Sequence, residues 1–278
     1  MLLSHCITDS GNEPVPHIAA PWAESGRLWY NRLDRQGSVY WTMDNTIRAI
    51  LFDLDGTLLS NDMDVFLPHY FGLLAAHVSH ILPPERFMAR LMQASEMMLA
   101  NDGQATNEKV FAEAFYPLAG RTREEMEPVF LEFYETKFPS LEQYTQRKPE
   151  ARQVVQLAFD LGYDVAIVTN PLFPATATEQ RLAWAGAADF AYQLVTTYEN
   201  SRAAKPNLLY FKQVLEAIGH PPEASLVVGD EDMDMVAAHL GCKTFLVPGP
   251  RTKLASSTPS PMYVGTLAEV GNLIQSWR

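Results

Sequence analysis

The chain has 278 residues, of which 47% are hydrophobic and 19% charged, so it can bury the core of one or two globular domains. Its formal net charge of −12 argues against nucleic acid as the main partner, because a phosphate backbone is bound by a basic surface. A small anionic substrate is still compatible with this charge if a metal ion neutralises the binding site locally.

The two cysteines, Cys6 and Cys242, form neither a CxxC motif nor a metal-binding spacing. No disulfide framework is therefore expected, and a reducing cytoplasm is the default location. The N-terminus lacks the apolar segment of a signal peptide, and no stretch reaches the roughly 18 apolar residues of a membrane-spanning helix. We expect a cytoplasmic protein with no membrane partner, and its oligomeric state is not legible in the sequence.

Residues 1–45 differ from the rest of the chain. They contain Trp22, Trp29 and Trp41 among scattered prolines and glycines, with little periodicity. The tryptophans argue against full disorder, because disordered tails are usually poor in aromatic residues. Three interpretations stay open: a small packed extension, translated upstream sequence with Met43 as the natural start, or a segment that docks a partner or a second copy.

The first clear elements are one buried strand and a group of helices. Residues 47–53 form a continuous apolar run, which is typical of a strand covered on both faces. Apolar residues then recur every three to four positions, and prolines or an Asn-Asp-Gly turn separate the periodic segments. These patterns predict about four helices between residues 62 and 145, in the segments 71–82, 85–100, 107–119 and 123–138.

After residue 148 helical and strand patterns alternate. The predicted helices are 149–162, 177–186, 206–219 and 233–241, and the predicted strands are 163–170, 191–197, 224–230 and 242–247. This alternation predicts an α/β fold with a parallel sheet and helices on both faces. Residues 46–61 and 146–278 would form the α/β core, residues 62–145 an inserted helical cap, and residues 1–45 an extension of uncertain structure.

Polar side chains follow the ends of the predicted strands. Binding sites in parallel sheets lie at the carboxyl ends of the strands, so these residues are expected to converge. Because buried carboxylates repel one another, a cation and a phosphate are expected among them. The residues are, in chain order, Asp53, Asp55, Gly56, Thr57, Thr169, Asn170, Lys205, Asp230, Asp232 and Asp234.

The chemistry of these residue types points to phosphoryl transfer. The Asp53 carboxylate can attack phosphorus directly, and a divalent cation would have to prevent repulsion from the substrate phosphate. Mg²⁺ suits such a site because it prefers oxygen ligands. Asp53 and Asp230 are the expected side-chain ligands, with the backbone carbonyl of Asp55 as a third. The Asp55 side chain would protonate the leaving alcohol and then deprotonate the attacking water.

Three further residues are expected to contact the phosphate directly. Thr169, Asn170 and the backbone amides near Gly56 can donate hydrogen bonds to phosphate oxygens. Lys205 would neutralise the negative charge that develops on the transferred group. The catalytic set is therefore Asp53, Asp55, Thr169 and Lys205.

The order of these motifs resembles that of the haloacid dehalogenase superfamily over residues 48 to about 247. The matching residues are Asp53-Leu54-Asp55-Gly56-Thr57, Thr169, Lys205, and Gly229-Asp230 followed by Asp234. The helical insert after the first motif resembles the cap of the phosphoglycolate-phosphatase-like branch. The resemblance implies a Rossmann-like core, a Mg²⁺-dependent reaction through an aspartyl phosphate, Asp53 as nucleophile and Asp55 as acid/base.

Two details refine what the resemblance implies. Dehalogenases of the superfamily typically lack an acid at the position of Asp55, so its presence favours a phosphatase. Glu231 and Asp232 make the fourth motif more acidic than its common Gly-Asp-Ser form. Which of Asp230, Asp232 and Asp234 bind the metal therefore stays open, with Asp230 first and Asp234 second.

Each motif alone has an ordinary explanation, such as a turn, a polar strand end or a solvated lysine. Their ordered occurrence favours hydrolysis of a small phosphorylated metabolite, whose identity the sequence does not reveal. A phosphomutase that passes the same phosphoryl group to a sugar is one alternative. A non-catalytic binding protein on the same fold is another, although all the catalytic residue types are present.

The predicted cap carries several residues with two possible roles. His77 and His80 are spaced for metal binding but have no third ligand nearby. Methionines 88, 92, 97 and 98 are expected mainly to pack inside the cap, with an adaptable apolar pocket as the alternative. Core packing is also the main expectation for Phe66, Tyr70 and Phe71, with substrate contact as the alternative.

Overall fold

The computed structural model describes residues 29–33, 39–43, 47–250 and 252–278. The chain divides into two compact units, Met1–Thr46 and Ile47–Arg278, which are treated separately. In the first unit β1 (Trp29–Leu33) and β2 (Val39–Met43) pair antiparallel, with Trp29 opposite Met43. Trp22 and Cys6 lie outside the described residues, so the origin and role proposed for residues 1–45 stay predictions.

The second unit is built on a six-stranded sheet of order β10-β9-β8-β3-β6-β7. All five strand pairings in it are parallel, which confirms the predicted α/β fold. No helix in the part of the chain that the structure describes is long and apolar enough to cross a membrane. The strands are β3 (Ala49–Phe52), β6 (Asp164–Ile167), β7 (Leu194–Val195), β8 (Ser225–Gly229), β9 (Lys243–Leu246) and β10 (Tyr263–Val264).

The central strand β3 is buried because helices cover both faces of the sheet. Ile50 and Phe52 belong to a hydrophobic cluster that contains side chains of α5 (Ala151–Asp160) and α9 (Leu267–Gln275). Ala49 and Leu51 belong to a second cluster, which contains side chains of α7 (Leu208–Ile218). Successive strand residues point to opposite faces, so the unbroken apolar run contributes side chains to both hydrophobic clusters.

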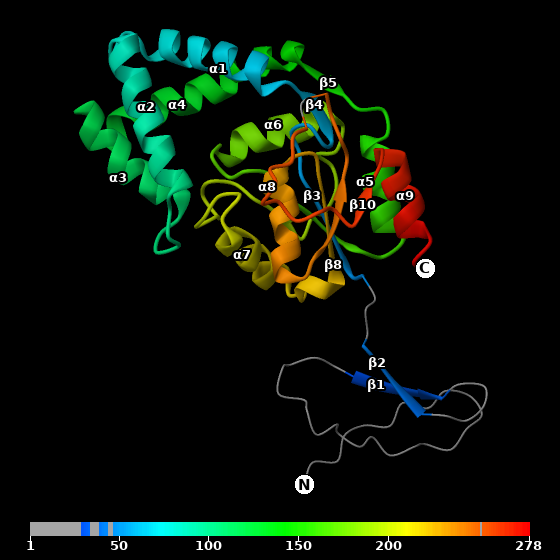
Figure 1. Ribbon diagram of the computed structural model, residues 1–278. Coiled ribbons are helices and arrows are strands. Elements are labelled where there is room, and N and C mark those ends of the chain that lie inside the picture. Colours follow the sequence, from blue (N-terminus) through cyan, green and yellow to red (C-terminus); the bar gives the residue numbers. More distant parts are fainter. Residues whose placement is uncertain (1–28, 34–38, 44–46, 251) are drawn as a thin grey trace. The chain divides into compact units, whose positions relative to one another are not determined.

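The helical segment leaves and rejoins this unit through a short antiparallel pair. β4 (Leu59–Asn61) pairs with β5 (Thr145–Arg147), and Leu59 lies opposite Arg147. The helices between these strands group together on one side of the unit (Figure 1). They are α1 (Met63–Val78), α2 (Pro84–Leu99), α3 (Asn107–Ala119), α4 (Arg123–Thr136) and the 3₁₀ helix η1 (Phe138–Tyr144).

Local sequence signals explain where these helices begin and end. Thr122 and Glu125 form a reciprocal capping box at the start of α4, and Gly120 ends α3 in the left-handed conformation that glycine adopts easily. The predicted helices of residues 62–145 are confirmed, with α1 beginning earlier than expected. That they form a separate cap domain stays a prediction, because residues 47–278 form one compact unit.

Some elements were predicted with the wrong extent, and others were not predicted at all. The single helix expected over 233–241 is a short α8 (Asp232–Met235) followed by a 3₁₀ turn, η3 (Val236–Leu240). Strand β7 covers two of the seven expected residues. Strand β10 and helix α9 were not predicted, although the Thr266–Glu269 capping box marks the start of α9. The remaining elements are α6 (Ala175–Ala185) and η2 (Pro222–Ala224).

The ambiguous residues of the helical segment are now placed. His77 Nε2 hydrogen-bonds the Val129 carbonyl at 3.1 Å and His80 Nδ1 the His77 carbonyl at 2.9 Å, so these ring nitrogens have protein partners. The prediction that the methionines pack inside the cap was wrong for two of them, since Met92 and Met97 are exposed. It holds for Met98, Phe66 and Tyr70, which are buried, and Met88 and Phe71 are partly buried against the core.

The thiol of Cys242, which directly precedes β9, provides a simple test of core burial. Burial raises its pKa to about 12, and Glu223 adds to the shift. At about pH 8 the reactive thiolate is then roughly one part in 10⁴. In a Cys6→Ser background we expect a thiol reagent to label the native protein at least about 100-fold more slowly than the urea-unfolded protein. Equal labelling rates would show that Cys242 is accessible.

Candidate active site

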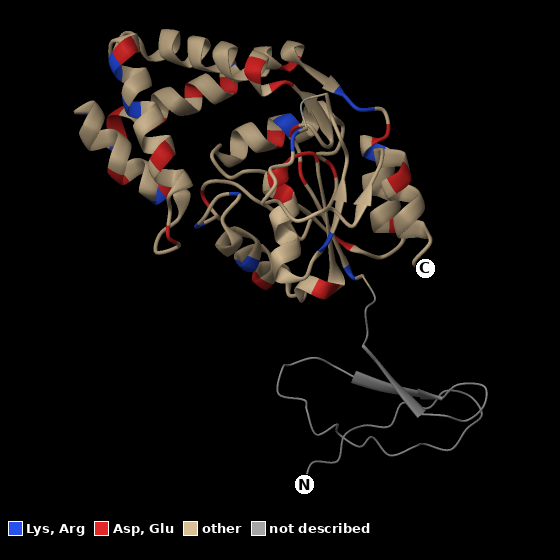
Figure 2. Ribbon diagram, in the orientation of Figure 1, with Lys and Arg blue, Asp and Glu red and all other residues tan. Residues whose placement is uncertain are grey.

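Two neighbouring strands bring the first and fourth motifs together. Asp53 follows β3 directly and its backbone N–H donates to the Val228 carbonyl of β8 at 2.8 Å. Asp230 follows β8 in the same way, at the same edge of the sheet. Figure 2 shows acidic positions gathered at the carboxyl ends of these central strands. The convergence expected from the order of the motifs is therefore present.

Three carboxylates and one lysine form the centre of the site. Asp53, Asp230 and Asp234 each offer one oxygen within 4.8 Å of the others. Lys205 Nζ donates to Asp53 Oδ1 at 2.8 Å and to Asp234 Oδ1 at 2.5 Å, and its side chain is almost fully buried. Lys205 thus joins the nucleophile candidate to a second acid. Asp232 is not part of this group among the described residues.

The pKa values of these groups reflect burial and crowding of like charges. Burial raises the pKa of Asp53 well above its ordinary value, and Asp234 and Asp230 add to the increase while Lys205 opposes it. Burial, with Asp234 and Glu231, raises the pKa of Asp230 to about 7. Burial alone would lower the pKa of Lys205, but the carboxylates of Asp234 and Asp53 outweigh it and raise that pKa. The cluster therefore stabilises an additional positive charge.

Two glycines provide the room for these carboxylates. Gly56 has a φ of +85°, and a Cβ atom there would overlap the Asp230 carboxylate. A Cβ atom on Gly229 would overlap the Asp234 carboxylate. Thr57 Oγ1 also donates to Asp230 Oδ1 at 3.1 Å. The glycine after Asp55 is thus required both by its backbone conformation and by the neighbouring acid.

The Asp55 side chain is held by residues that the sequence analysis did not identify. Asn61 Nδ2 donates to Asp55 Oδ1 at 2.9 Å, and Arg181 Nη1 on α6 forms an ion pair with Asp55 Oδ2. The Arg181 side chain is buried, and its guanidinium carbon lies 4.5 Å from the centre of the Phe173 ring. No motif marked Arg181, because in the sequence it resembles an ordinary arginine of an amphipathic helix.

The residues expected to contact phosphate lie at the same sheet edge but have different local roles. The Thr169 carbonyl accepts from Tyr210 Oη at 2.9 Å, and Thr169 is buried. Asn170 Oδ1 accepts from the backbone N–H of Lys205 at 3.2 Å, which joins the second motif to the third. Phosphate binding by Thr169 and Asn170 stays a prediction.

The expected phosphate contact of the Gly56 amide does not agree with this geometry. The Gly56 N–H donates to the Leu59 carbonyl at 2.7 Å and is therefore used inside the motif loop. The Gly56 carbonyl accepts from Lys148 Nζ, a second lysine that the sequence analysis missed. Burial lowers the pKa of Lys148, against the opposing effects of Asp230 and Asp53. Gly56 thus shapes the site through its conformation rather than through a free amide.

A family model described as haloacid dehalogenase-like hydrolase matches residues 47–240, well over half of the chain. The chain belongs to the haloacid dehalogenase-like hydrolase family. The matched range contains all the residues of the site described above, so the sequence resemblance to this family is confirmed.

Individual relatives of this haloacid dehalogenase-like hydrolase include phosphatases and dehalogenases. A phosphoglycolate phosphatase from Aquifex aeolicus is 28% identical over 214 residues, which cover 77% of this chain and 90% of the relative. A 2-haloacid dehalogenase structure from Pseudomonas syringae pv. Tomato has a TM-score of 0.59 at 17% identity, covering 84% of this chain and 100% of that one.

A HAD phosphatase structure from Thermococcus onnurineus has a TM-score of 0.53 at 19% identity and covers 82% of this chain and 98% of that one. At such low identities the two solved structures show the fold alone. The hydrolase resembles the phosphoglycolate-phosphatase-like branch of the superfamily, as the sequence analysis indicated.

The acidic cluster of this hydrolase fits a divalent metal ion. Carboxylate oxygens are the ligands that hard divalent cations prefer, and Asp53, Asp230 and Asp234 bring three of them together. Lys205 contacts two of these acids, so it offsets only part of their negative charge. Burial is the main cause of the raised pKa values of Asp53 and Asp230, and the neighbouring carboxylates add to both increases, so a bound cation would favour the ionised forms.

Proposed function

We propose that this hydrolase is a Mg²⁺-dependent phosphatase that acts on a small phosphomonoester through an aspartyl phosphate. The observation that carries the proposal is the environment of the buried Asp53 carboxylate. Lys205 Nζ donates to it, and Asp53, Asp230 and Asp234 each offer one oxygen close enough to bind the same metal ion. A cation beside a buried carboxylate keeps that carboxylate ionised. The carboxylate can then attack as a nucleophile without first being deprotonated.

In the first half of the reaction an Asp53 oxygen attacks the phosphorus of the ester. The bond between phosphorus and the ester oxygen breaks, and Asp55, which enters this step protonated, gives its proton to the departing alcohol. Asn61 and Arg181 contact the Asp55 side chain and would stabilise the carboxylate that this proton transfer leaves. In the second half Asp55 takes a proton from water, whose oxygen attacks the phosphorus, and free phosphate leaves with Asp53 regenerated.

The other residues of the site bind the phosphate or the metal ion and neutralise charge. Lys205 lies within hydrogen-bond distance of Asp53, so it is positioned to offset negative charge on the transferred group. Thr169 and Asn170 would donate hydrogen bonds to phosphate oxygens from the end of β6. Asp53, Asp230, Asp234 and the Asp55 carbonyl would hold Mg²⁺, which when bound reduces the repulsion between the phosphate and the carboxylates.

A phosphomutase would share every residue of the first half-reaction. It differs in passing the phosphoryl group to a second hydroxyl instead of water, and the described geometry identifies no residue dedicated to such a hydroxyl. A non-catalytic binding protein is less well supported, because Asp53, Asp55 and Lys205 are all present and Lys205 contacts Asp53 directly. Hydrolysis of a small phosphorylated metabolite is therefore the function we favour.

The first test is phosphate release from 4-nitrophenyl phosphate with Mg²⁺ and with a chelator. We expect release to fall at least about 100-fold on chelation and to return when excess Mg²⁺ is added, because the three carboxylates then lose their shared cation. Ca²⁺ serves as the comparison ion, since its larger size and looser geometry suit this compact cluster less well. Release that is unaffected by chelation would contradict the proposed metal dependence.

A further inference from the structure

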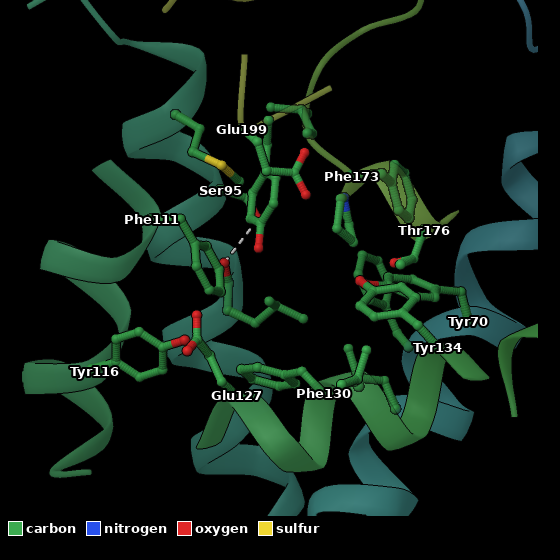
Figure 3. A pocket seen from close by; sticks show the side chains of 18 of the residues that line it. Tyr70, Ser95, Phe111, Tyr116, Glu127, Phe130, Tyr134, Phe173, Thr176 and Glu199 are labelled. Carbon is green, nitrogen blue, oxygen red and sulfur yellow. Dashed lines mark hydrogen bonds between the residues drawn. The ribbon is translucent and has the colours of Figure 1, made fainter. Parts of the chain in front are cut away.

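A large cavity lies between the four helices and the motif loops, separate from the acidic cluster. Its volume is about 710 Å³, which is within the roughly 300–1,000 Å³ of cavities that enclose drug-sized ligands. Its wall comes from α1, α2, α3 and α4 and from residues 172–176 and 198–199 of the core. Figure 3 shows the rings of Phe111, Phe130, Tyr134 and Phe173 around the open space.

Several polar groups in the wall have protein partners, and most of the lining residues are apolar. The hydroxyls of Tyr70 and Tyr134 hydrogen-bond each other at 2.9 Å. Ser95 Oγ donates to the Leu91 carbonyl at 2.9 Å, and Glu199 Oε1 accepts from the Ala175 N–H at 2.9 Å. A ligand therefore needs few hydrogen-bonding groups to fit this wall.

The charge of the wall is unsuited to an anion. In the part of the chain that the structure describes, the wall contains Glu124, Glu127 and Glu199 but no Lys, Arg or His. A carboxylate placed in this cavity would leave water without gaining a cationic partner, which is unfavourable. The cavity is therefore poorly suited to the carboxylate of 2-phosphoglycolate, the substrate in the name of the Aquifex aeolicus relative.

Exposed apolar side chains mark the entrance on the helical side. Met92, Leu99 and Leu131 line the cavity, yet they are 43%, 45% and 50% exposed. Large apolar side chains exposed at the rim of a cavity are typical of a ligand-binding site, and methionine adapts to ligands of different shape.

Two side chains in contact, Phe173 and Arg181, connect the cavity wall to the predicted acid/base. Phe173 forms part of its wall, and the Arg181 guanidinium stacks over the Phe173 ring. Arg181 in turn pairs with Asp55, the group expected to protonate the leaving alcohol. The remainder of that alcohol must extend from the oxygen that Asp55 protonates, and this cavity offers an enclosed apolar space on the far side of Phe173 and Arg181.

We propose that this cavity binds a neutral, largely apolar group, and that in the reaction it holds the leaving alcohol of the phosphomonoester. This assignment rests on the proposed phosphatase function. It predicts that the hydrolase prefers esters of bulky apolar alcohols to 2-phosphoglycolate, although 2-phosphoglycolate is named for its relative.

The test compares esters of primary alcohols, whose leaving groups are of similar reactivity: ethyl, hexyl and 2-phenylethyl phosphate and 2-phosphoglycolate. We expect kcat/KM for the hexyl and 2-phenylethyl esters to exceed that for the ethyl ester and 2-phosphoglycolate by at least about tenfold, because their apolar groups leave water. A flat series, or a preference for 2-phosphoglycolate, would overturn the proposal.

Matched variants place the effect in the cavity. Ser95→Phe adds a ring to the wall, whereas Gln93→Phe adds the same ring on an exposed position of α2 outside the wall. Ser95→Phe should reduce the hexyl-to-ethyl ratio of kcat/KM to about twofold, and Gln93→Phe should keep the wild-type ratio. A preference that survives Ser95→Phe would place the apolar contact elsewhere.

A binding measurement separates failure of this assignment from failure of the proposed function. Fluorescence of neutral N-phenyl-1-naphthylamine is titrated with the wild-type protein and both variants, without any phosphate ester. Saturable binding that Ser95→Phe weakens at least about tenfold and Gln93→Phe leaves unchanged would support the cavity even if no ester is hydrolysed. Absence of saturable binding would overturn it even if the protein is an active phosphatase.

Discussion

Replacing Asp53 with Asn is expected to reduce Mg²⁺-dependent phosphate release at least about 10³-fold, or about 4 kcal/mol in activation free energy. The amide of Asn has nearly the same shape as the carboxylate but is a far weaker nucleophile. It also removes one of the three negative oxygens that could share a cation. The measurement is the rate of phosphate release from 4-nitrophenyl phosphate at saturating Mg²⁺.

The matched control for this variant is Asp232→Asn. Asp232 lies in the same acidic segment as Asp230 and Asp234 but is outside the cluster, so the activity of Asp232→Asn should stay within about threefold of wild type. Circular dichroism of both variants checks that the fold is kept. Wild-type activity in Asp53→Asn would show that Asp53 is not the nucleophile, and a large loss in Asp232→Asn would extend the site to that residue.

A second readout addresses the covalent intermediate itself. Acid quenching of the wild-type protein during turnover of a ³²P-labelled ester should trap label on the protein, because an acyl phosphate survives brief treatment with acid better than treatment with base. Asp53→Asn should carry none. Label that persists in the variant would assign the phosphoryl acceptor to another residue.

The sequence was sufficient for the parts of the site that follow from strand order. Asp53 and Asp230 directly follow apolar strands, Thr169 lies two residues after the end of β6, and parallel pairing brings the ends of such strands to one edge. The apolar run of β3 indicated a strand buried on both faces, which the two hydrophobic clusters confirm. These inferences needed only local patterns and the direction of the strands.

The sequence was insufficient where a contact depends on helix packing. Arg181 and Asp55 are 126 residues apart, and only the position of α6 beside the first motif loop brings them together. The amide of Gly56 was misassigned because the loop folds back and uses it for the Leu59 carbonyl. An apolar pocket near Met92 and Met98 was only an alternative in the sequence analysis, since the cavity wall combines four helices with two segments distant in the sequence.

Helix α8 illustrates a different limit, in which local interactions compete with helix propensity. Residues 233–241 have an apolar pattern that predicts one helix, yet the α-helical hydrogen bonding stops at Met235. Asp234 is buried against Lys205, and its Oδ2 accepts from the Glu231 N–H at 3.2 Å. Tertiary contacts of one acidic side chain thus occupy the first turn, and a 3₁₀ turn follows it.

Replacing Arg181 with Met is expected to lower the free energy of unfolding by about 3 kcal/mol or more. The side chains of Arg181 and Asp55 are 1% and 11% exposed, so removal of the guanidinium leaves a nearly buried carboxylate that keeps its hydrogen bond from Asn61. Urea unfolding followed by circular dichroism measures the loss. Met keeps much of the length and apolar volume of the Arg side chain against Phe173.

Arg152 offers a matched control at the surface. It also pairs with an aspartate, Asp189, and also stacks over a ring, that of Phe190 at 4.9 Å. Both charged side chains of that pair are about half exposed or more, so Arg152→Met should cost no more than about 1 kcal/mol. Equal losses in the two variants would show that burial of the Arg181–Asp55 pair adds nothing to stability.

The double variant Arg181→Met with Asp55→Asn distinguishes an unpaired charge from lost packing. If the cost of Arg181→Met comes from the abandoned Asp55 carboxylate, neutralising Asp55 should recover at least about half of it. Phosphate release should stay low in the double variant, because Asn at position 55 cannot transfer the proton that the leaving alcohol needs. Stability would then recover without activity, which separates the structural role of Arg181 from the chemical role of Asp55. No recovery of stability would instead assign the loss to packing between Arg181 and Phe173.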